Sequence, residues 1–361
     1  MKKKFYSLLA IVVAMFCSSL AIAQDRLWFL NTTHFPTVYT FYAINKDGSG
    51  AEPAMRFPSG YAGHDYGRFP FHLMQASDGV LYGVSMGGGE HGLGAIFKIT
   101  GEKASNIYNF TTGNAQSITE GKDGFLYGVG KRSHSSGFIF RIKPDGSEYQ
   151  ETLFSQYAFE PSELMTTGTG EIVGVTPYII YKFKPDISGI QTIHTFEKAT
   201  GIQGQGNLIQ GNDGYLYGIT TRGGNFNYGV IYKISPSGEG YQVILHFNNV
   251  NGRYPVRGLV QNNSGNLFGV TPQGGTHKSG VIFTLRPDGS GFQKLYEYTE
   301  DFNSGSAGSL KLDNEGNLYA DTRSPARILK INIANRTITD LPLPAGVQQL
   351  TNFNLFRAVA P

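Results

Sequence analysis

Histidine recurs at one fixed place in a repeated stretch of this sequence. In three copies it stands three residues before a glycine that leads into an Ile-Phe-Lys-Ile-like segment, as His91, His134 and His277, and Phe226 takes this place in a fourth copy. Imidazole gains or loses a proton near neutral pH, so these residues are candidates for acid, base or hydrogen-bonding roles. The simpler alternative is that a polar side chain is tolerated at a loop tip.

Arginine lies beside tyrosine in two other segments, Tyr66-Gly67-Arg68 and Arg253-Tyr254. An aromatic ring can stack on the apolar face of a sugar, and a guanidinium can pair in bidentate fashion with a carboxylate or sulfate. Tyrosines in such loops can also pack on their own strands, and this alternative stays open. We predict a ligand-binding site with these members: Tyr66, Arg68, His91, Arg132, His134, Arg222, Arg253, Tyr254 and His277.

No metal or cofactor is predicted. The histidine-bearing copies are not all neighbours, so a single zinc ion could not collect them. The only cysteine, Cys17, lies in an N-terminal leader, which excludes disulfides and thiolate ligands from the rest of the chain. Gly-Gly loops at 87–89, 223–224 and 274–275 precede strand-like segments instead of helices, so they are predicted to be hairpin loops and not nucleotide-binding loops. Whether the protein is an enzyme stays open.

An internal repeat predicts the strands and loops that position these residues. The marker Asp-Gly-x-Leu-Tyr-Gly begins at Asp78, Asp123 and Asp213, and weaker copies lie at 169–174, 264–269 and 315–320. Starting from Trp28, the tyrosine position recurs at steps of 54, 45, 46, 44, 51 and 51 residues. Each period holds four short segments rich in β-branched and aromatic residues, separated by turn residues, which is typical of a propeller blade.

The predicted fold is therefore all-β, a seven-bladed β-propeller of four-stranded blades in a single domain over residues 24–361. The first blade begins at its second strand and lacks an innermost one. The surplus apolar segment 349–356 can supply that strand, so we predict a ring closed by a C-terminal strand that completes the first blade.

The repeat resembles a known family. The pattern Asp-Gly-x-Leu-Tyr-Gly-x-Thr, a Gly-Gly loop, Gly-Val-Ile-Phe-Lys-Ile and Pro-Asp-Gly-Ser is clearest at 213–238 and 264–290. It is similar to the Gloeo/Verruco (GloVer) tandem repeat of secreted bacterial proteins. The resemblance covers about 25–345. It implies a propeller and export, and it implies no catalytic residue.

The two faces of such a propeller differ in charge. Loops between the second and third strands, and between blades, emerge on one face, which we call the loop face, and carry the predicted ligand-binding residues. The remaining turns form the turn face, which collects aspartates such as Asp145 and Asp288. Aspartate beside glycine is ordinary hairpin chemistry, which we favour over calcium binding.

Residues 1–23 have the features of a secretory signal peptide, with Lys2 to Lys4, an apolar run and Ala-Ile-Ala before Gln24. Without these lysines, 27 basic residues balance 27 acidic ones, so the charge predicts no nucleic-acid partner. No other apolar stretch is long enough for a membrane span, and no membrane insertion is expected. We predict a monomer that is secreted or periplasmic.

The predicted fold and the N-terminal leader favour a non-catalytic binding module, and the sequence contains no His-Glu-x-x-His or Walker motif. Its partner would be a glycan, with anionic glycans favoured, or an envelope protein. The alternative is a polysaccharide lyase acting on uronate-containing glycans, in which Arg neutralises the carboxylate and His or Tyr transfers protons.

Cleavage of the leader is predicted between Ala23 and Gln24, which leaves an exported protein without a thiol. The intact mass of the exported form measures this. A mass that begins at a lipid-modified Cys17 would show a lipoprotein instead.

Overall fold

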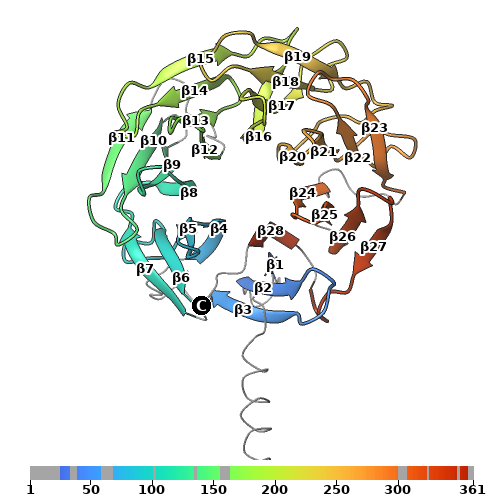
Figure 1. Cartoon of the computed structure of the whole chain (residues 1–361). Helices are drawn as coiled ribbons and strands as arrows, with labels where there is room; N and C mark the ends of the chain where they lie inside the picture. The colour runs from blue at the N-terminus through green and yellow to red at the C-terminus, as the bar shows by residue number, and fades with distance from the viewer. Residues whose placement is uncertain are drawn as a thin grey trace, which may run out of the picture.

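Seven antiparallel four-stranded sheets stand in a ring around a common axis (Figure 1). The structure, a computed structural model, describes residues 25–32, 39–57, 68–100, 103–133, 136–154, 163–299, 307–322, 325–347 and 350–356. Within these ranges no helix has the length and apolar character of a membrane span. The predicted seven-bladed propeller is confirmed, and the predicted signal peptide lies outside the described residues.

The four strands of each blade succeed one another from the axis outward. From the innermost strand, blade 1 contains β28 (Leu350–Phe356), β1 (Arg26–Thr32), β2 (Tyr39–Asn45) and β3 (Glu52–Phe57). Blade 2 contains β4 (Arg68–Gln75), β5 (Leu81–Gly87), β6 (Ala95–Thr100) and β7 (Lys103–Asn109). Blade 3 contains β8 (Asn114–Glu120), β9 (Leu126–Ser133), β10 (Ser136–Ile142) and β11 (Gln150–Phe154).

The remaining four blades follow the same order. Blade 4 contains β12 (Leu164–Thr166), β13 (Ile172–Val175), β14 (Ile179–Phe183) and β15 (Gln191–Thr195). Blade 5 contains β16 (Ile202–Gln210), β17 (Leu216–Arg222), β18 (Val230–Ile234) and β19 (Gln242–His246). Blade 6 contains β20 (Val260–Gln261), β21 (Leu267–Thr271), β22 (Val281–Leu285) and β23 (Gln293–Glu297). Blade 7 contains β24 (Ala307–Leu312), β25 (Asn317–Thr322), β26 (Arg327–Asn332) and β27 (Ile338–Leu341).

The hydrophobic core lies between neighbouring blades. The sheet faces of blades 1 and 2, for example, meet through Phe41, Phe57 and Phe97, whose rings contact edge to face. Comparable buried clusters join each of the other neighbouring pairs, including blade 7 to blade 1. A blade is therefore stable only between two partners, because both of its faces are apolar.

The repeated marker turn is held by its own aspartate. Asp123 accepts a hydrogen bond from the Tyr127 hydroxyl at 2.6 Å and another from the backbone N–H of Phe125 at 3.2 Å. Asp213 and Tyr217 form the same 2.6 Å bond. Two copies lack both members of this pair, with Thr169 and Val173 in one and Ser264 and Phe268 in the other. Hydrogen bonding within the repeat thus accounts for these marker aspartates.

A glycine in the second strand makes room for an aromatic ring on the third. A Cβ at Gly128 would lie 2.2 Å from the Phe140 ring, and one at Gly218 would lie 2.3 Å from the Tyr232 hydroxyl. Blade 7 has Ala320 at this position, paired with Leu329 instead of an aromatic residue. In blade 7 the motif glycine and the aromatic residue are thus both replaced, whereas in blade 1 Phe29 takes the glycine position and its ring stacks on Tyr42.

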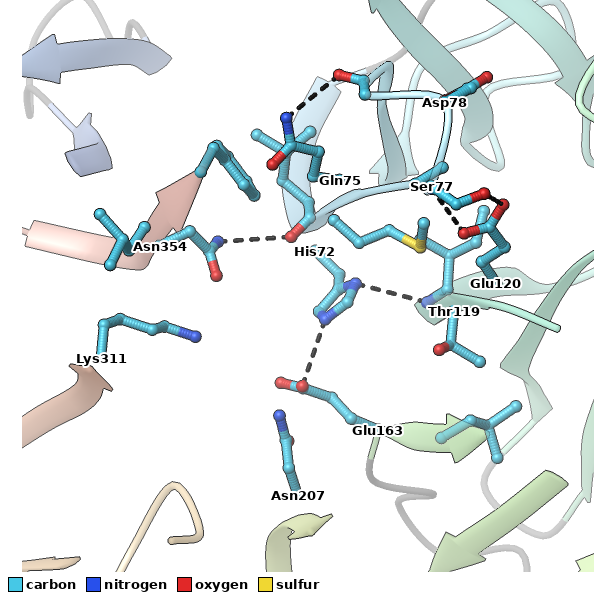
Figure 2. A pocket seen from close by; sticks show the side chains of 18 residues that line it. His72, Gln75, Ser77, Asp78, Thr119, Glu120, Glu163, Asn207, Lys311 and Asn354 are labelled. Carbon is cyan, nitrogen blue, oxygen red and sulfur yellow. Dashed lines mark hydrogen bonds and ion pairs between the residues drawn. The ribbon is translucent and has the colours of Figure 1, made fainter. Parts of the chain in front are cut away.

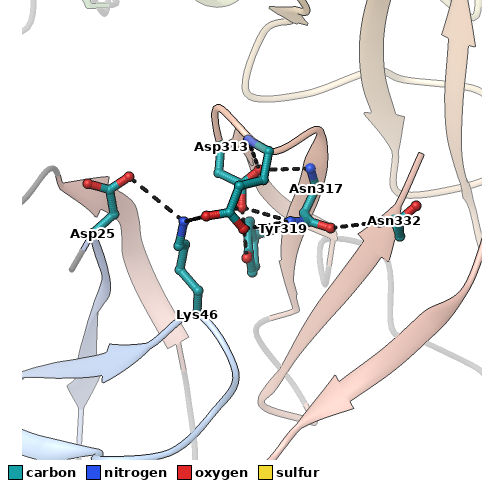
Figure 3. A network of polar contacts seen from close by, with 7 residues as sticks. Asp25, Lys46, Asp313, Asn317, Tyr319 and Asn332 are labelled. Atoms are coloured by element: carbon teal, nitrogen blue, oxygen red, sulfur yellow. Dashed lines mark hydrogen bonds and ion pairs between the residues drawn. The ribbon is translucent and has the colours of Figure 1, made fainter. Parts of the chain in front are cut away.

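The ring is closed on two levels. Next to the axis, β28 pairs antiparallel with β1, with Leu355 opposite Leu27 and Leu350 opposite Asn31. On the turn face, Lys46 of blade 1 reaches blade 7, where its ammonium lies 2.7 Å from Glu315 and 3.7 Å from Asp313 (Figure 3). Burial alone would lower the pKa of Lys46, but the surrounding carboxylates raise it above its usual value. The predicted closure by the C-terminal strand is confirmed.

Truncation after Ala345 removes β28 and is expected to give a poorly folded, aggregation-prone protein. Leu350 and Phe353 are each 1% exposed, and losing a large buried side chain costs about 2–5 kcal/mol. The unpaired edge of β1 would also be open to pairing with other chains. Thermal melting and light scattering measure the effect, with a chain ending at Phe356 as the control. A truncated protein that stays monomeric and melts like the control would contradict the closure argument.

Candidate functional site

Three loops of blades 5 and 6 pack against one another on the loop face. The Tyr254 N–H donates to the Tyr228 carbonyl at 2.9 Å, and the Gly275 N–H donates to the Asn249 carbonyl at 2.7 Å. These bonds fix the loop between the blades against the loop that precedes the third strand in each blade. We call the resulting area the blade 5–6 loop surface and define it by residues 222–229, 248–257 and 272–280.

Three residues of the predicted site contact one another on this surface. The Arg222 guanidinium carbon lies 4.3 Å from the centre of the Tyr254 ring, and its Nη1 donates to the Tyr254 hydroxyl at 3.2 Å. The Arg253 guanidinium carbon lies 5.4 Å from the same ring and 5.8 Å from that of Tyr228. Two guanidinium groups therefore share one aromatic ring, which holds them through cation–π attraction.

Both positive charges lack a carboxylate partner in the described part of the chain. The Arg253 Nε is buried and has no hydrogen-bond partner among the described residues. Tyr254 itself has a φ of 59°, the left-handed region that L residues with side chains rarely adopt. Such a conformation persists only where its surroundings impose it, so the ring position between the two arginines is fixed by the packed loops.

Exposed apolar side chains lie on the same loops as these charges. Phe226 is 55% exposed and Val250 is 69% exposed, on two of the three loops that form the surface. Apolar groups beside free guanidinium groups form an amphipathic surface that can contact an anionic ligand with apolar faces.

Arg132 occupies a different environment from the one predicted. It lies in blade 3, where it forms an ion pair with Glu151 and its guanidinium carbon is 5.7 Å from the Phe138 ring. Its charge is thus already neutralised within the blade, unlike the charges of Arg222 and Arg253.

The other predicted residues are distributed around the ring. His277 is exposed within the blade 5–6 loop surface, whereas His91 is exposed in blade 2, on the other side of the ring (Figure 1). Arg68 begins β4, and only its backbone is described. Tyr66 and His134 lie outside the described residues.

Gly83-Val84-Ser85-Met86-Gly87 has the spacing of the nucleophile motif Gly-x-Ser-x-Gly. The structure places Ser85 within β5, where it is fully buried and its hydroxyl accepts a hydrogen bond from the Ala95 N–H at 2.9 Å. A nucleophile elbow requires an exposed serine at a turn from strand to helix, so this serine has no such role.

A second candidate site lies at the centre of the ring and was missing from the sequence-based prediction. A cavity of about 840 Å³ is lined by innermost strands from six of the blades (Figure 2). Its polar residues include His72 on β4, Glu163 directly before β12, Asn207 on β16, Lys311 on β24 and Asn354 on β28.

A hydrogen-bond chain fixes Glu163 in this cavity. The Ile118 N–H donates to His72 Nδ1 at 3.4 Å, which directs the ring proton at Nε2 toward Glu163, 3.3 Å away. Burial alone would raise the pKa of Glu163, but His72, Lys311 and a hydrogen bond with Asn207 lower it to about 2. Glu163 is therefore a carboxylate at neutral pH.

Lys311 faces this carboxylate without touching it. Its side chain points into the cavity toward Glu163 (Figure 2), and its ammonium forms no ion pair or hydrogen bond with any described residue. Burial lowers the pKa of Lys311, while Glu163 and Asp321 act in the opposite direction. Asp321 is 4% exposed, and burial raises its pKa to about 6.

One signal in the sequence could have identified the cavity. Side chains alternate along the innermost strand, so the residue before its repeated leucine lies on the opposite side of the strand from that leucine, and in three blades it lines the cavity. At Leu73, Leu164 and Leu208 the preceding residues are His72, Glu163 and Asn207. Polar residues of different types at one repeat position are not required by the fold.

Solved structures with the same fold have diverse functions. Virginiamycin B lyase from Staphylococcus aureus aligns with a TM-score of 0.58 at 16% identity, over 79% of this chain and 87% of that one. Puromycin hydrolase aligns with a TM-score of 0.58 at 11% identity, over 90% and 54% of the two chains. A nidogen/laminin complex aligns with a TM-score of 0.54 at 12% identity, over 93% and 100%. These identities show a common fold alone.

The chain matches no curated protein. It does match a family model, the Gloeobacter/Verrucomicrobia repeat, over residues 179–327. That stretch extends from β14 in blade 4 to the start of β26 in blade 7. The resemblance predicted from the marker motifs is confirmed there, and this part of the propeller is built from the Gloeobacter/Verrucomicrobia repeat.

Proposed function

We propose that the protein is a non-catalytic binding module that takes an anionic glycan on its blade 5–6 loop surface. The observation that carries this proposal is the pair of guanidinium groups, from Arg222 and Arg253, which share the Tyr254 ring and have no carboxylate partner in the described chain. Two arginines held close together are ordinarily neutralised by acidic side chains. In this protein a ligand carboxylate or sulfate would supply the missing negative charge.

The surroundings of the arginines favour a sugar over a small inorganic anion. Phe226 and Val250 offer exposed apolar area on the loops that carry the charges, and the C–H face of a pyranose ring can pack on such area. A polymer of acidic sugars can present several anionic groups and several apolar faces along the three loops. The proposal therefore names uronate-containing or sulfated glycans.

The turn face would not attract such a polymer. Its aspartates, such as Asp145 and Asp288, are engaged in turns, where each accepts a backbone N–H from a serine two residues later. Hydrogen bonds from the serine hydroxyl and from this backbone N–H lower the pKa of both carboxyls, so both stay charged. Screening beyond about 10 Å at ordinary ionic strength leaves close contacts to decide the affinity.

Replacing Arg222 and Arg253 by alanine is expected to weaken binding to polygalacturonate by about tenfold each, since each change removes a charge-assisted contact. The double variant should lose retention on affinity gels that contain polygalacturonate or a sulfated glycan. Raising the salt concentration should weaken binding of the unmodified protein, and neutral dextran should not retain it.

Arg132→Ala provides the matched control, because that arginine is already paired with Glu151. Asp145→Asn and Asp288→Asn test the turn face. All three variants should keep the affinity of the unmodified protein. Failure of the unmodified protein to bind any acidic glycan, or loss of binding in the turn-face variants alone, would exclude this assignment.

One contact favours the lyase as a second candidate. The Tyr254 hydroxyl lies 3.2 Å from Arg222 Nη1, so a base and a carboxylate-neutralising group stand side by side. In β-elimination a base removes the proton next to the uronate carboxylate, the glycosidic oxygen leaves from the adjacent carbon, and a C=C bond forms between the two carbons. In this second candidate function the Tyr254 oxygen takes that proton and returns it to the leaving glycosidic oxygen.

Incubation with polygalacturonate separates the two functions. We expect no rise in the ultraviolet absorbance of an unsaturated uronate, and we expect Tyr254→Phe to bind as tightly as the unmodified protein because the ring is retained. A lyase would instead produce this absorbance, and Tyr254→Phe would abolish it while leaving binding intact.

A further inference from the structure

We propose that the central cavity binds a small zwitterion, such as a free dipeptide, between the Glu163 carboxylate and the Lys311 ammonium. This site is separate from the blade 5–6 loop surface and does not depend on the function proposed there.

The cavity presents two opposite charges that do not neutralise each other. Glu163 belongs to blade 4 and Lys311 to blade 7, so they project from different walls of the ring (Figure 2). No ion pair joins them, although each influences the pKa of the other. Both side chains are only partly buried, and a charge at such a site gains stability from an ion pair or a charge-assisted hydrogen bond. The Lys311 ammonium, which has no such partner among the described residues, indicates a place for a ligand anion.

The Glu163 carboxylate is held in an orientation in which it can accept a hydrogen bond from a ligand cation. His72 Nε2 lies 3.3 Å from the carboxylate and helps to fix its orientation, and Asn207 lies beside it in the cavity wall. An ammonium group entering from the cavity would add a charge-assisted hydrogen bond to this fixed acceptor. Because the neighbours hold the carboxylate in place, its ordering adds little to the cost of binding.

A zwitterion matches both charges at once. Its ammonium would lie against Glu163 and its carboxylate against Lys311, where the Asn354 amide on the adjacent innermost strand can contribute. A simple amine or a simple carboxylic acid would match one charge and leave the other without a partner. The cavity of about 840 Å³ is within the usual range of small-molecule pockets and exceeds the size of a dipeptide.

The cavity extends toward the turn face. Its lining includes the turn residues Ser77, Asp78 and Gly79 together with Glu120, whose carboxylate accepts hydrogen bonds from the Ser77 N–H at 2.7 Å and the Ser77 hydroxyl at 2.8 Å. Asp78 and Glu120 thus place two further carboxylates in the cavity lining. They favour the approach of a ligand that carries an ammonium group and disfavour a purely anionic one.

Calorimetric titration of the full chain with three probes tests this site. The probes are L-alanyl-L-alanine, its N-acetyl form, which lacks the ammonium, and its C-terminal amide, which lacks the carboxylate. The free dipeptide should bind at least about tenfold more tightly than either modified form. Glu163→Gln should abolish the preference over the N-acetyl form, and Lys311→Met should abolish the preference over the amide.

Glu171→Gln and Lys182→Met are the matched controls, because these residues form a 2.8 Å ion pair in blade 4 and do not line the cavity. They should preserve the full preference for the free dipeptide. Thermal melting verifies that all four variants are folded. The proposal is overturned if the unmodified protein binds none of the probes, if it binds all three equally, or if the preferences survive in Glu163→Gln and Lys311→Met. Because polygalacturonate binding is measured separately, either site can fail without the other.

Discussion

The pairing of β28 with β1 is the constraint on which the rest of the molecule depends. Each blade buries both of its faces against its neighbours, so a break anywhere in the ring exposes two apolar surfaces. Blade 1 is the only blade made from distant parts of the described chain. Hydrogen bonds along Leu27 and Leu355, together with the Lys46 contacts to blade 7, hold this one non-local junction.

A closed ring also explains where ligand-binding chemistry can reside. The side chains inside each blade are needed for packing, as the close fit of Gly128 against the Phe140 ring shows. Two regions escape this requirement. They are the loops on one face and the axial side of the innermost strands, and these regions contain Arg222 and Arg253 in one case and Glu163 and Lys311 in the other.

The fold could be predicted from the sequence because each repeat contains the residues that stabilise its own turns and strands. The marker aspartate accepts a hydrogen bond from the tyrosine hydroxyl four residues later, as Asp123 does from Tyr127. The motif is therefore recognisable in the copies that form this bond. The number of blades and the closing strand followed from counting these copies. Periodicity predicts what repeats, and it therefore predicts the scaffold.

The candidate sites were harder to predict because they consist of departures from the repeat. Repeat alignment placed Arg132 and Arg222 in comparable loops, yet Glu151 neutralises the first and no described carboxylate neutralises the second. That difference depends on side-chain neighbours that no spacing reveals. His72 and Glu163 were overlooked for a related reason. They differ in type at equivalent positions, and their contact spans the cavity between blades 2 and 4.

The position of β28 also sets the order in which the molecule can be completed. Blades 2 to 7 each form from consecutive hairpins, whereas blade 1 needs the first and last described strands at the same time. A chain made from its N-terminus must therefore hold β1 without its inner partner until almost all of it has been synthesised. Contacts of such long sequence separation form slowly, and open strand edges can pair with other chains. The ring therefore stays incomplete until β28 has been synthesised. During that time the open edge of β1 can pair with another unfinished copy of the chain.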